Sequence, residues 1–439
     1  MSVTKRLKRL TGEGTGPGPR GPQTRSEQIS DLRQRIEAIM KRRPVAGTPA
    51  GQPPVTVSRK AAPPLDGVIN GREMASDHGR LFVSHDIHDE HARHGNRTIG
   101  ELSVVDMSAA AFLSGNMELA VLQWSDGLFL DTETTGLAGG TGTLAFLIGV
   151  GWFEKRTFVT RQIFARDFSE EKACLSFLSE IAREKRFLIT FNGKAFDIGL
   201  LSTRFIMNRL PDPLAELPHL DLLHPARRLV GHRLENSRLA TIEPHILGLY
   251  RKNDIPGSEI PQRYFDWLRR RDPAIMKDVF EHNRLDVISM ASLTLHLTGL
   301  IAGPLDLPEA DHRDLLAVAR LMATRADEKG TKRLLKYLIA SDRHGVAPEA
   351  GKMLSLIYKR AGEWDKAVDI WEQMLLECPG DVFAAIELAK WHEHRTRDIG
   401  KALELVTEIL QGSRRLAADE RKSLEHRKQR LYERFCRSK

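Results

Sequence analysis

The order of apolar runs in the first half of the chain is the feature that most constrains its fold. Three strand-like runs follow one another with short connections, and a helix, a fourth strand and a second helix come next. Strands joined by short connections must be antiparallel, whereas a helix before the fourth strand permits a right-handed parallel crossover. A mixed sheet with helices on both faces is therefore predicted, with three antiparallel strands first and parallel strands after them. The predicted strands are 121–132, 143–154, 157–165 and 186–191, and the predicted helices are 169–185 and 196–210.

Two carboxylates lie one residue apart at the end of the first predicted strand. Asp131 and Glu133 occupy alternate positions, and alternate positions of a strand share one face. Two adjacent carboxylates repel each other unless a cation lies between them, and hard ions such as Mg²⁺ prefer oxygen ligands. The pattern indicates a divalent metal site, although an acidic turn at a strand end would give the same two residues.

Two later segments add further acidic groups. Asn192 to Asp197 follows the fourth predicted strand and places Asp197 at the start of a helix. His282 and Asp286 lie within a helical pattern over 273–300, and their i, i+4 spacing puts them on one face. We therefore expect four carboxylates and one imidazole to converge.

These three motifs, in this order, resemble those of the DEDD superfamily of 3′-to-5′ exonucleases: D-x-E, N-x(3)-F-D, and an aromatic residue or His followed by Asp. More narrowly, segments 131–143, 219–228 and 254–261 resemble the YprB-type proteins, and the resemblance extends over 65–412. It implies an α/β RNase H-like domain followed by an all-α region of TPR-like helices.

The resemblance also implies roles for the motif residues around two Mg²⁺ or Mn²⁺ ions. Asp131 would bridge both ions, Glu133 and Asp286 would hold the ion that activates water, and Asp197 would support the other. His282 would act as the general base, since an imidazole near its ordinary pKa suits that task. It lies four residues before Asp286, the spacing of the Tyr-type enzymes, so a helix-surface residue is the alternative interpretation.

Candidate nucleic-acid contacts lie near these motifs. Thr134 and Asn192 correspond to positions that contact sugar or phosphate in the resembled family. Arg227, Arg228 and Arg251 would flank a groove for the phosphate backbone, although arginine side chains are usually only solvated. Phe191, Phe196 and Tyr264 are available for base stacking, with Phe196 more typical of a core residue. The glycine-rich segment 136–142 lacks the Lys of a P-loop and predicts a hairpin or a loop of close approach.

Charge and composition divide the chain into four parts. Residues 1–64 carry 13 Lys and Arg against 4 Asp and Glu, whereas the whole chain has 66 against 58, so the basic excess lies in this tail. It is expected to be mostly disordered, with a short helix at 26–43 and a Pro-rich linker. Residues 65–116 contain five histidines without a nearby Cys and are expected to form a polar lead-in loop rather than a zinc site. The nuclease-like domain is predicted over 117–304 and the TPR-like helices over 305–439.

The spacing of Leu354, Tyr358, Ala367, Trp371 and Pro379 fits a 34-residue TPR unit. Such helices bind partner proteins on a concave surface, and a purely structural cap is the alternative.

The function predicted from these features is a metal-dependent 3′-to-5′ exonuclease that hydrolyses DNA or RNA by a two-metal mechanism. The alternative is a weakly active or inactive scaffold that binds nucleic acid and recruits partners through its TPR-like helices. The three Cys residues are far apart and predict no disulfide framework. No membrane span or leader is expected, because no apolar run reaches about 18 residues. A cytoplasmic location is therefore expected.

Overall fold

The computed structural model describes residues 64–136, 142–303, 310–341, 343–412 and 416–437. The predicted tail helix at 26–43 and most of the glycine-rich segment, 137–141, lie outside the described residues. Residues from Ala62 onward form one compact unit.

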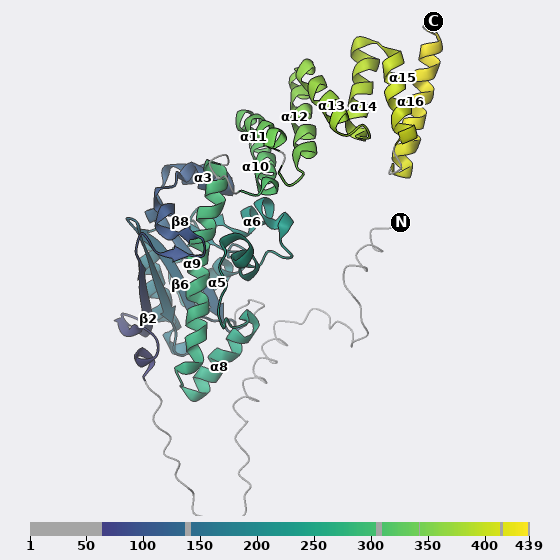
Figure 1. The fold of residues 1–439 in the computed structure, drawn as a ribbon. Helices are drawn as coiled ribbons and strands as arrows, with labels where there is room; N and C mark the ends of the chain where they lie inside the picture. The colour runs from purple at the N-terminus through teal and green to yellow at the C-terminus, as the bar shows by residue number, and fades with distance from the viewer. Residues whose placement is uncertain (1–63, 137–141, 304–309, 342, 413–415, 438–439) are drawn as a thin grey trace, which may run out of the picture. The chain divides into compact units, whose positions relative to one another are not determined.

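A seven-stranded mixed sheet organises the N-terminal half of this unit, in the order β1-β2-β7-β6-β5-β8-β9 (Figure 1). Strands β5, β6 and β7 pair antiparallel, β8 runs parallel to β5, and β9 runs parallel to β8. This arrangement confirms the predicted order of three antiparallel strands followed by parallel ones. The strands are β1 Gly71–Ser76, β2 Gly79–His88, β5 Gly127–Thr134, β6 Ala145–Glu154, β7 Thr157–Phe164, β8 Phe187–Thr190 and β9 His219–Asp221, and a separate small ribbon pairs β3 Arg93–His94 with β4 Arg97–Thr98.

The expectation of a polar loop over 65–116 is wrong, because this segment supplies two strands of the main sheet. Strand β2 pairs with both β1 and β7, so its polar residues belong to an extended strand. The segment continues through a helix, α3 Met107–Ser114, and through 3-10 turns at Met117–Val121 and Trp124–Asp126. Those turns explain why β5 begins at Gly127 rather than at 121. Strand β2 is buried over only four of its residues, and its His and Asp residues made its sequence resemble a polar loop.

Helices cover both faces of the sheet. One face packs against α4 Glu171–Arg183 and α5 Asp197–Met207. The other packs against α8 Ile260–Arg270 and the long helix α9 Ala274–Ala302, which crosses β5, β6 and β7 (Figure 1). By length and composition α9 could span a membrane, but 72% of its most apolar stretch is buried within the protein. Its apolarity is accounted for by its place in the core.

The C-terminal half is helical, and each helix packs on the next one along the chain. Helix α10 also contacts α6 Leu223–Leu229 and α9. Leu354, Tyr358, Ala367 and Trp371 are all buried, as a repeat core requires. The assignment to the TPR class stays a prediction. The helices are α10 His312–Thr324, α11 Glu328–Ser341, α12 Ala347–Ala361, α13 Trp364–Glu377, α14 Val382–Trp391, α15 Ile399–Gly412 and α16 Ala418–Arg437.

Candidate active site

Strand β5 carries the first two acidic residues of the site. Asp131 pairs with Gly149 and Glu133 with Leu147 on β6, so both carboxylates lie on the face of the sheet that α9 covers. The register of the two strands shifts directly after Glu133. The regular ladder therefore ends where the acidic residues stand, at the carboxyl end of β5.

Two glycines on β6 allow α9 to approach β5 closely. A Cβ atom on Gly149 would lie 2.3 Å from Oδ1 of Asn283, and one on Gly151 would lie 2.8 Å from a methyl group of Val287. The close approach lets Asn283 on α9 donate from Nδ2 to Oδ2 of Asp131 at 2.8 Å. Gln162 on β7 in turn donates to Oδ1 of Asn283 at 2.9 Å, which fixes the amide. Asn283 therefore connects α9, the helix that carries His282 and Asp286, to the acidic pair on β5.

A methyl group at Gly149 is expected to displace α9 from the site. The collision in Gly149→Ala involves a buried, doubly hydrogen-bonded amide, so overpacking should cost about 1 to 3 kcal/mol of stability and lower any activity that depends on the acidic residues. Gly299→Ala is the matched control, because among the described residues no atom beyond its chain neighbours and the local backbone of α9 lies within 4 Å of the added Cβ. Thermal unfolding and rate measurements compare the two variants, and equal behaviour would refute the close-approach argument.

The third acidic residue enters from the turn between β8 and α5. The Thr132 hydroxyl donates a hydrogen bond to Asp197, the first residue of α5. Asn192 in this turn adopts a left-handed backbone with φ of 67°, a conformation that Asn tolerates better than most residues. Both Asp221 oxygens accept backbone N–H groups, from Asn192 at 2.8 Å and from Lys194 at 3.2 Å. Asp221 therefore anchors the turn that positions Asp197.

The acidic residues repel one another in the metal-free protein. Desolvation raises the pKa of Asp131 well above its ordinary value, and the charges of Asp286 and Asp197 add to the effect. Desolvation likewise raises the pKa of Glu133, with further contributions from Asp131 and Asp286. The pKa of Asp197 is also raised, chiefly by desolvation. A bound cation would stabilise the ionised form of carboxylates whose pKa is raised in this way. Their oxygen atoms are the donors that Mg²⁺ and Mn²⁺ prefer.

The fourth carboxylate already has a cationic partner. Arg251 forms an ion pair with Asp286, donates to Asp254 at 3.1 Å and binds Glu243 through Nε at 2.7 Å. In this conformation, among the residues described, no three His, Cys, Asp or Glu side chains form a ready metal cage. The four carboxylates supply the oxygen donors that such ions prefer, but Asp286 would have to exchange Arg251 for a metal ion in order to bind one.

His282 lies between two acidic side chains. Its Nδ1 is 2.7 Å from Oδ1 of Asp254, and its Nε2 is 3.7 Å from Oδ2 of Asp286. The side chain is only 15% exposed. The i, i+4 relation predicted from sequence thus places this imidazole beside the predicted ligand Asp286.

Sequence reasoning missed three residues of the site: Asn283, Asp254 and Glu243. The interpretation of Arg251 as a flank of the phosphate groove is wrong, because its side chain is buried in ion pairs with carboxylates. Asp254 opens a segment that was singled out for its family resemblance, and Arg251 lies three residues before it. Asn283 follows His282 directly, but nothing in the sequence distinguished it. Glu243 is buried and gave no signal at all.

The predicted nucleic-acid contacts occupy different environments. The Thr134 hydroxyl donates to the carbonyl of Gly136 at 2.9 Å. Arg227 and Arg228 are exposed on α6 and form no ion pair with any residue that the structure describes. The interpretation of Phe196 as a core residue is wrong, since it is 58% exposed beside Asp197. Tyr264 is fully buried and stacks on another aromatic ring, so it is not available to a base.

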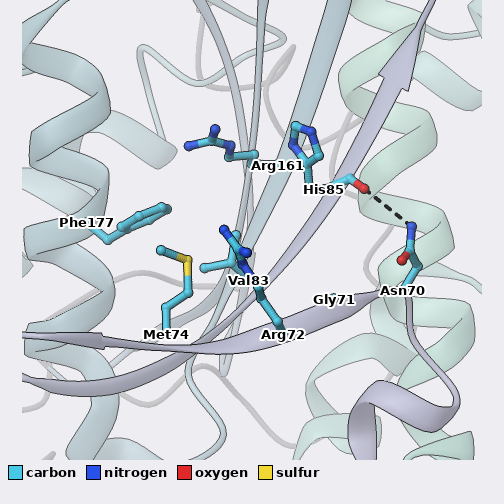
Figure 2. A pocket seen from close by; sticks show the side chains of 8 residues that line it. All are labelled: Asn70, Gly71, Arg72, Met74, Val83, His85, Arg161 and Phe177. Atoms are coloured by element: carbon cyan, nitrogen blue, oxygen red, sulfur yellow. Dashed lines mark hydrogen bonds between the residues drawn. The ribbon is translucent and has the colours of Figure 1, made fainter.

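A hollow of about 530 Å³ lies on the other face of the sheet (Figure 2). Arg161, which lines it, pairs with Val150, and Val150 pairs with Leu130, the neighbour of Asp131 that points the opposite way. The hollow and the carboxylates are therefore separated by the sheet itself. Its lining residues are Asn70, Gly71, Arg72, Met74, Val83, His85, Arg161 and Phe177.

The fold and the position of the acidic residues agree with a family comparison. A model of the RNase H superfamily matches residues 128–298, a range that contains Asp131, Glu133, Asp197, His282 and Asp286. The domain is thus of the RNase H superfamily. The chain is also 34% identical over 352 residues to YprB, an uncharacterized protein of Bacillus subtilis strain 168, with 78% of this chain and 83% of YprB aligned. The chain belongs to the YprB family, as its motifs led us to expect.

A solved structure gives a weaker similarity. The family B DNA polymerase of Pyrobaculum calidifontis matches 45% of this chain and 29% of its own length, with 15% identity and a TM-score of 0.31. At this level the similarity supports no argument about function.

Proposed function

We propose that this protein is a metal-dependent 3′-to-5′ exonuclease. One observation carries the proposal: Asp131 and Glu133 from β5, Asp197 from α5 and Asp286 from α9 interact electrostatically at the end of β5, in a domain of the RNase H superfamily. Membership in that superfamily favours a nucleic-acid substrate. The exonuclease polarity and the DEDD subtype are parts of the proposal, as is the use of two ions.

Each acidic residue has a role at the metal site. Asp131, Glu133, Asp197 and Asp286 would hold two Mg²⁺ or Mn²⁺ ions, with Asp131 shared between them. Bound divalent cations neutralise charge on the phosphoryl group and make a water molecule more acidic. Asn283 keeps the Asp131 carboxylate in place through its 2.8 Å hydrogen bond. Thr132 does the same for Asp197.

The reaction is hydrolysis of the last phosphodiester bond of a strand. The oxygen of a water molecule bonds to phosphorus, the bond from phosphorus to the 3′ oxygen of the preceding nucleotide breaks, and that oxygen takes a proton. His282 would accept a proton from the attacking water, because its ring faces Asp286. The products are a nucleoside 5′-monophosphate and a strand shortened by one nucleotide.

A panel of end-labelled substrates tests the proposal. Single- and double-stranded DNA and RNA, labelled at either end, are incubated with Mg²⁺, Mn²⁺ or EDTA. We expect 5′-labelled strands to shorten progressively from their 3′ ends, only when metal is present and only with the wild-type Asp131. If no product depends on both the metal and Asp131, the enzyme proposal fails and a nucleic-acid-binding scaffold becomes the better account.

Phe196 is expected to stack against a base of the substrate, since its ring is exposed directly before Asp197. Base stacking on an aromatic ring contributes about 1 to 3 kcal/mol, so Phe196→Ala should weaken binding of a single strand by about that amount. Binding is measured by fluorescence anisotropy in Ca²⁺, an ion chosen to limit cleavage. Ile206→Ala, an exposed apolar change on the same helix, is the control, and an equal loss in both would contradict the stacking role.

A further inference from the structure

The segment from Arg251 to Asp254 has no part in the three acidic motifs, yet its side chains reach into the site. It lies in a connection between the π-helical turn Glu243–Leu247 and α8. Asn253 within it has a left-handed backbone with φ of 58°, which turns the chain just before Asp254. The Asp254 side chain is 22% exposed and meets His282 on α9, 28 residues further along the chain.

The contact between Asp254 and His282 determines which ring nitrogen of the imidazole carries the proton. A carboxylate can only accept hydrogen bonds, so the 2.7 Å contact requires that Nδ1 of His282 carries the proton. In the neutral ring the lone pair then lies on Nε2, the nitrogen that faces Asp286. The hydrogen bond to Asp254 therefore fixes both the orientation of the His282 ring and its tautomer.

Asp254 is itself held in place by two further contacts. Its Oδ1 also accepts the backbone N–H of Ile255 at 3.0 Å, and its Oδ2 accepts a hydrogen bond from Arg251 at 3.1 Å. Arg251 is almost fully buried, with 6% of its side chain exposed. Its guanidinium also donates hydrogen bonds to Glu243, which hold it in place. A carboxylate restrained on both oxygens has little freedom to leave the imidazole.

We propose that Asp254 is a positioning residue that orients His282 and fixes its Nδ1–H tautomer, so that Nε2 is presented to the water that attacks the phosphodiester. This inference rests on the proposed nuclease function for its kinetic consequence. The pairing of Asp254 with His282 can be tested without any activity.

A double-mutant cycle tests the kinetic consequence. Outer residues that orient a functional group typically contribute 10- to 100-fold, so we expect Asp254→Ala to lower kcat by about that factor with little change in KM. In the His282→Ala background the same substitution should change kcat less than twofold, because the group that it positions is gone. Asp254→Asn keeps one acceptor oxygen and should give a rate between wild type and Asp254→Ala. Asp278→Asn, a half-exposed change one turn before His282 on α9, is the control and should leave kcat unchanged.

Nitrogen NMR of the full-length chain labelled with ¹⁵N-histidine tests the pairing directly, without substrate or metal. We expect the His282 signals, assigned by their loss in His282→Ala, to show protonated Nδ1 in wild type and a shift toward protonated Nε2 in Asp254→Ala. Unchanged signals in a folded Asp254→Ala, or an equal loss of kcat in the two backgrounds, would overturn the proposal. If the wild type shows no metal-dependent cleavage, or if His282→Ala keeps its full rate, the proposed function or the role of His282 fails, and the NMR result still decides the pairing.

Discussion

Asp131→Asn is expected to abolish metal-dependent cleavage while making the metal-free protein more stable. The substitution removes the carboxylate that we propose is shared by both metal ions, and a loss of about 1,000-fold in rate corresponds to about 4 kcal/mol of transition-state stabilisation. Desolvation, together with repulsion among several like charges, raises the pKa of Asp131 and Glu133, and the substitution removes one of these buried charges. The rate is measured on the labelled strand that the wild type degrades, and stability by thermal unfolding in EDTA.

The stability difference between Asp131→Asn and wild type should depend on pH with a definite sign. The pKa of Asp131 is raised in the folded chain above its ordinary value of 3.8. Between those two pKa values the folded state therefore holds more protons than the unfolded state, and wild-type stability falls as pH rises. The advantage of Asp131→Asn in EDTA should be absent below about pH 4 and should grow as pH rises through this window. Saturating Mn²⁺ should raise the wild-type melting temperature and reverse the order of the two proteins. An advantage that does not vary with pH would mean that the pKa of Asp131 is not raised in the folded chain.

Arg251→Met is expected to be the most destabilising substitution in the domain. Arg251 contacts three carboxylates, and one of them, Glu243, has only 1% of its side chain exposed. Removing one partner of a buried ion pair leaves the other charge uncompensated, at a cost of about 3 to 5 kcal/mol. Thermal and urea unfolding of the variant measure this loss.

A second substitution and a control separate charge from packing in this result. Adding Glu243→Gln to Arg251→Met removes the stranded buried charge, so part of the lost stability should return. Arg227→Met changes an exposed arginine and should alter stability by no more than about 0.5 kcal/mol. A melting temperature of Arg251→Met equal to that of Arg227→Met would show that the buried cation is not needed.

The sheet could be predicted from sequence wherever its strands are buried on both faces. Strands β6 and β7 are almost continuously buried, and both were placed within two residues of their observed ends. Strand β2 is buried over only part of its length, and its His and Asp residues resemble a loop. Its pairing with β7 depends on residues about 75 positions away, which no local pattern contains.

The residues of the site also fall into those that could be predicted from the sequence and those that could not. The convergence of the four acidic residues could be predicted because a strand and a helix fix the spacing of their carboxylates. Asn283, Arg251 and Glu243 could not, since each acts through a contact with a residue distant in sequence. For Phe196 the prediction failed in the opposite direction. Its apolar character predicted burial, but the turn before α5 leaves the side chain exposed to solvent.

The guanidinium of Arg251 has a consequence for the order of events after synthesis. It balances the charge of Asp286 from within the protein, so this carboxylate does not need a metal ion as its countercharge. Folding of the domain should therefore not depend on magnesium or manganese. A chelator should abolish the proposed activity without unfolding the protein.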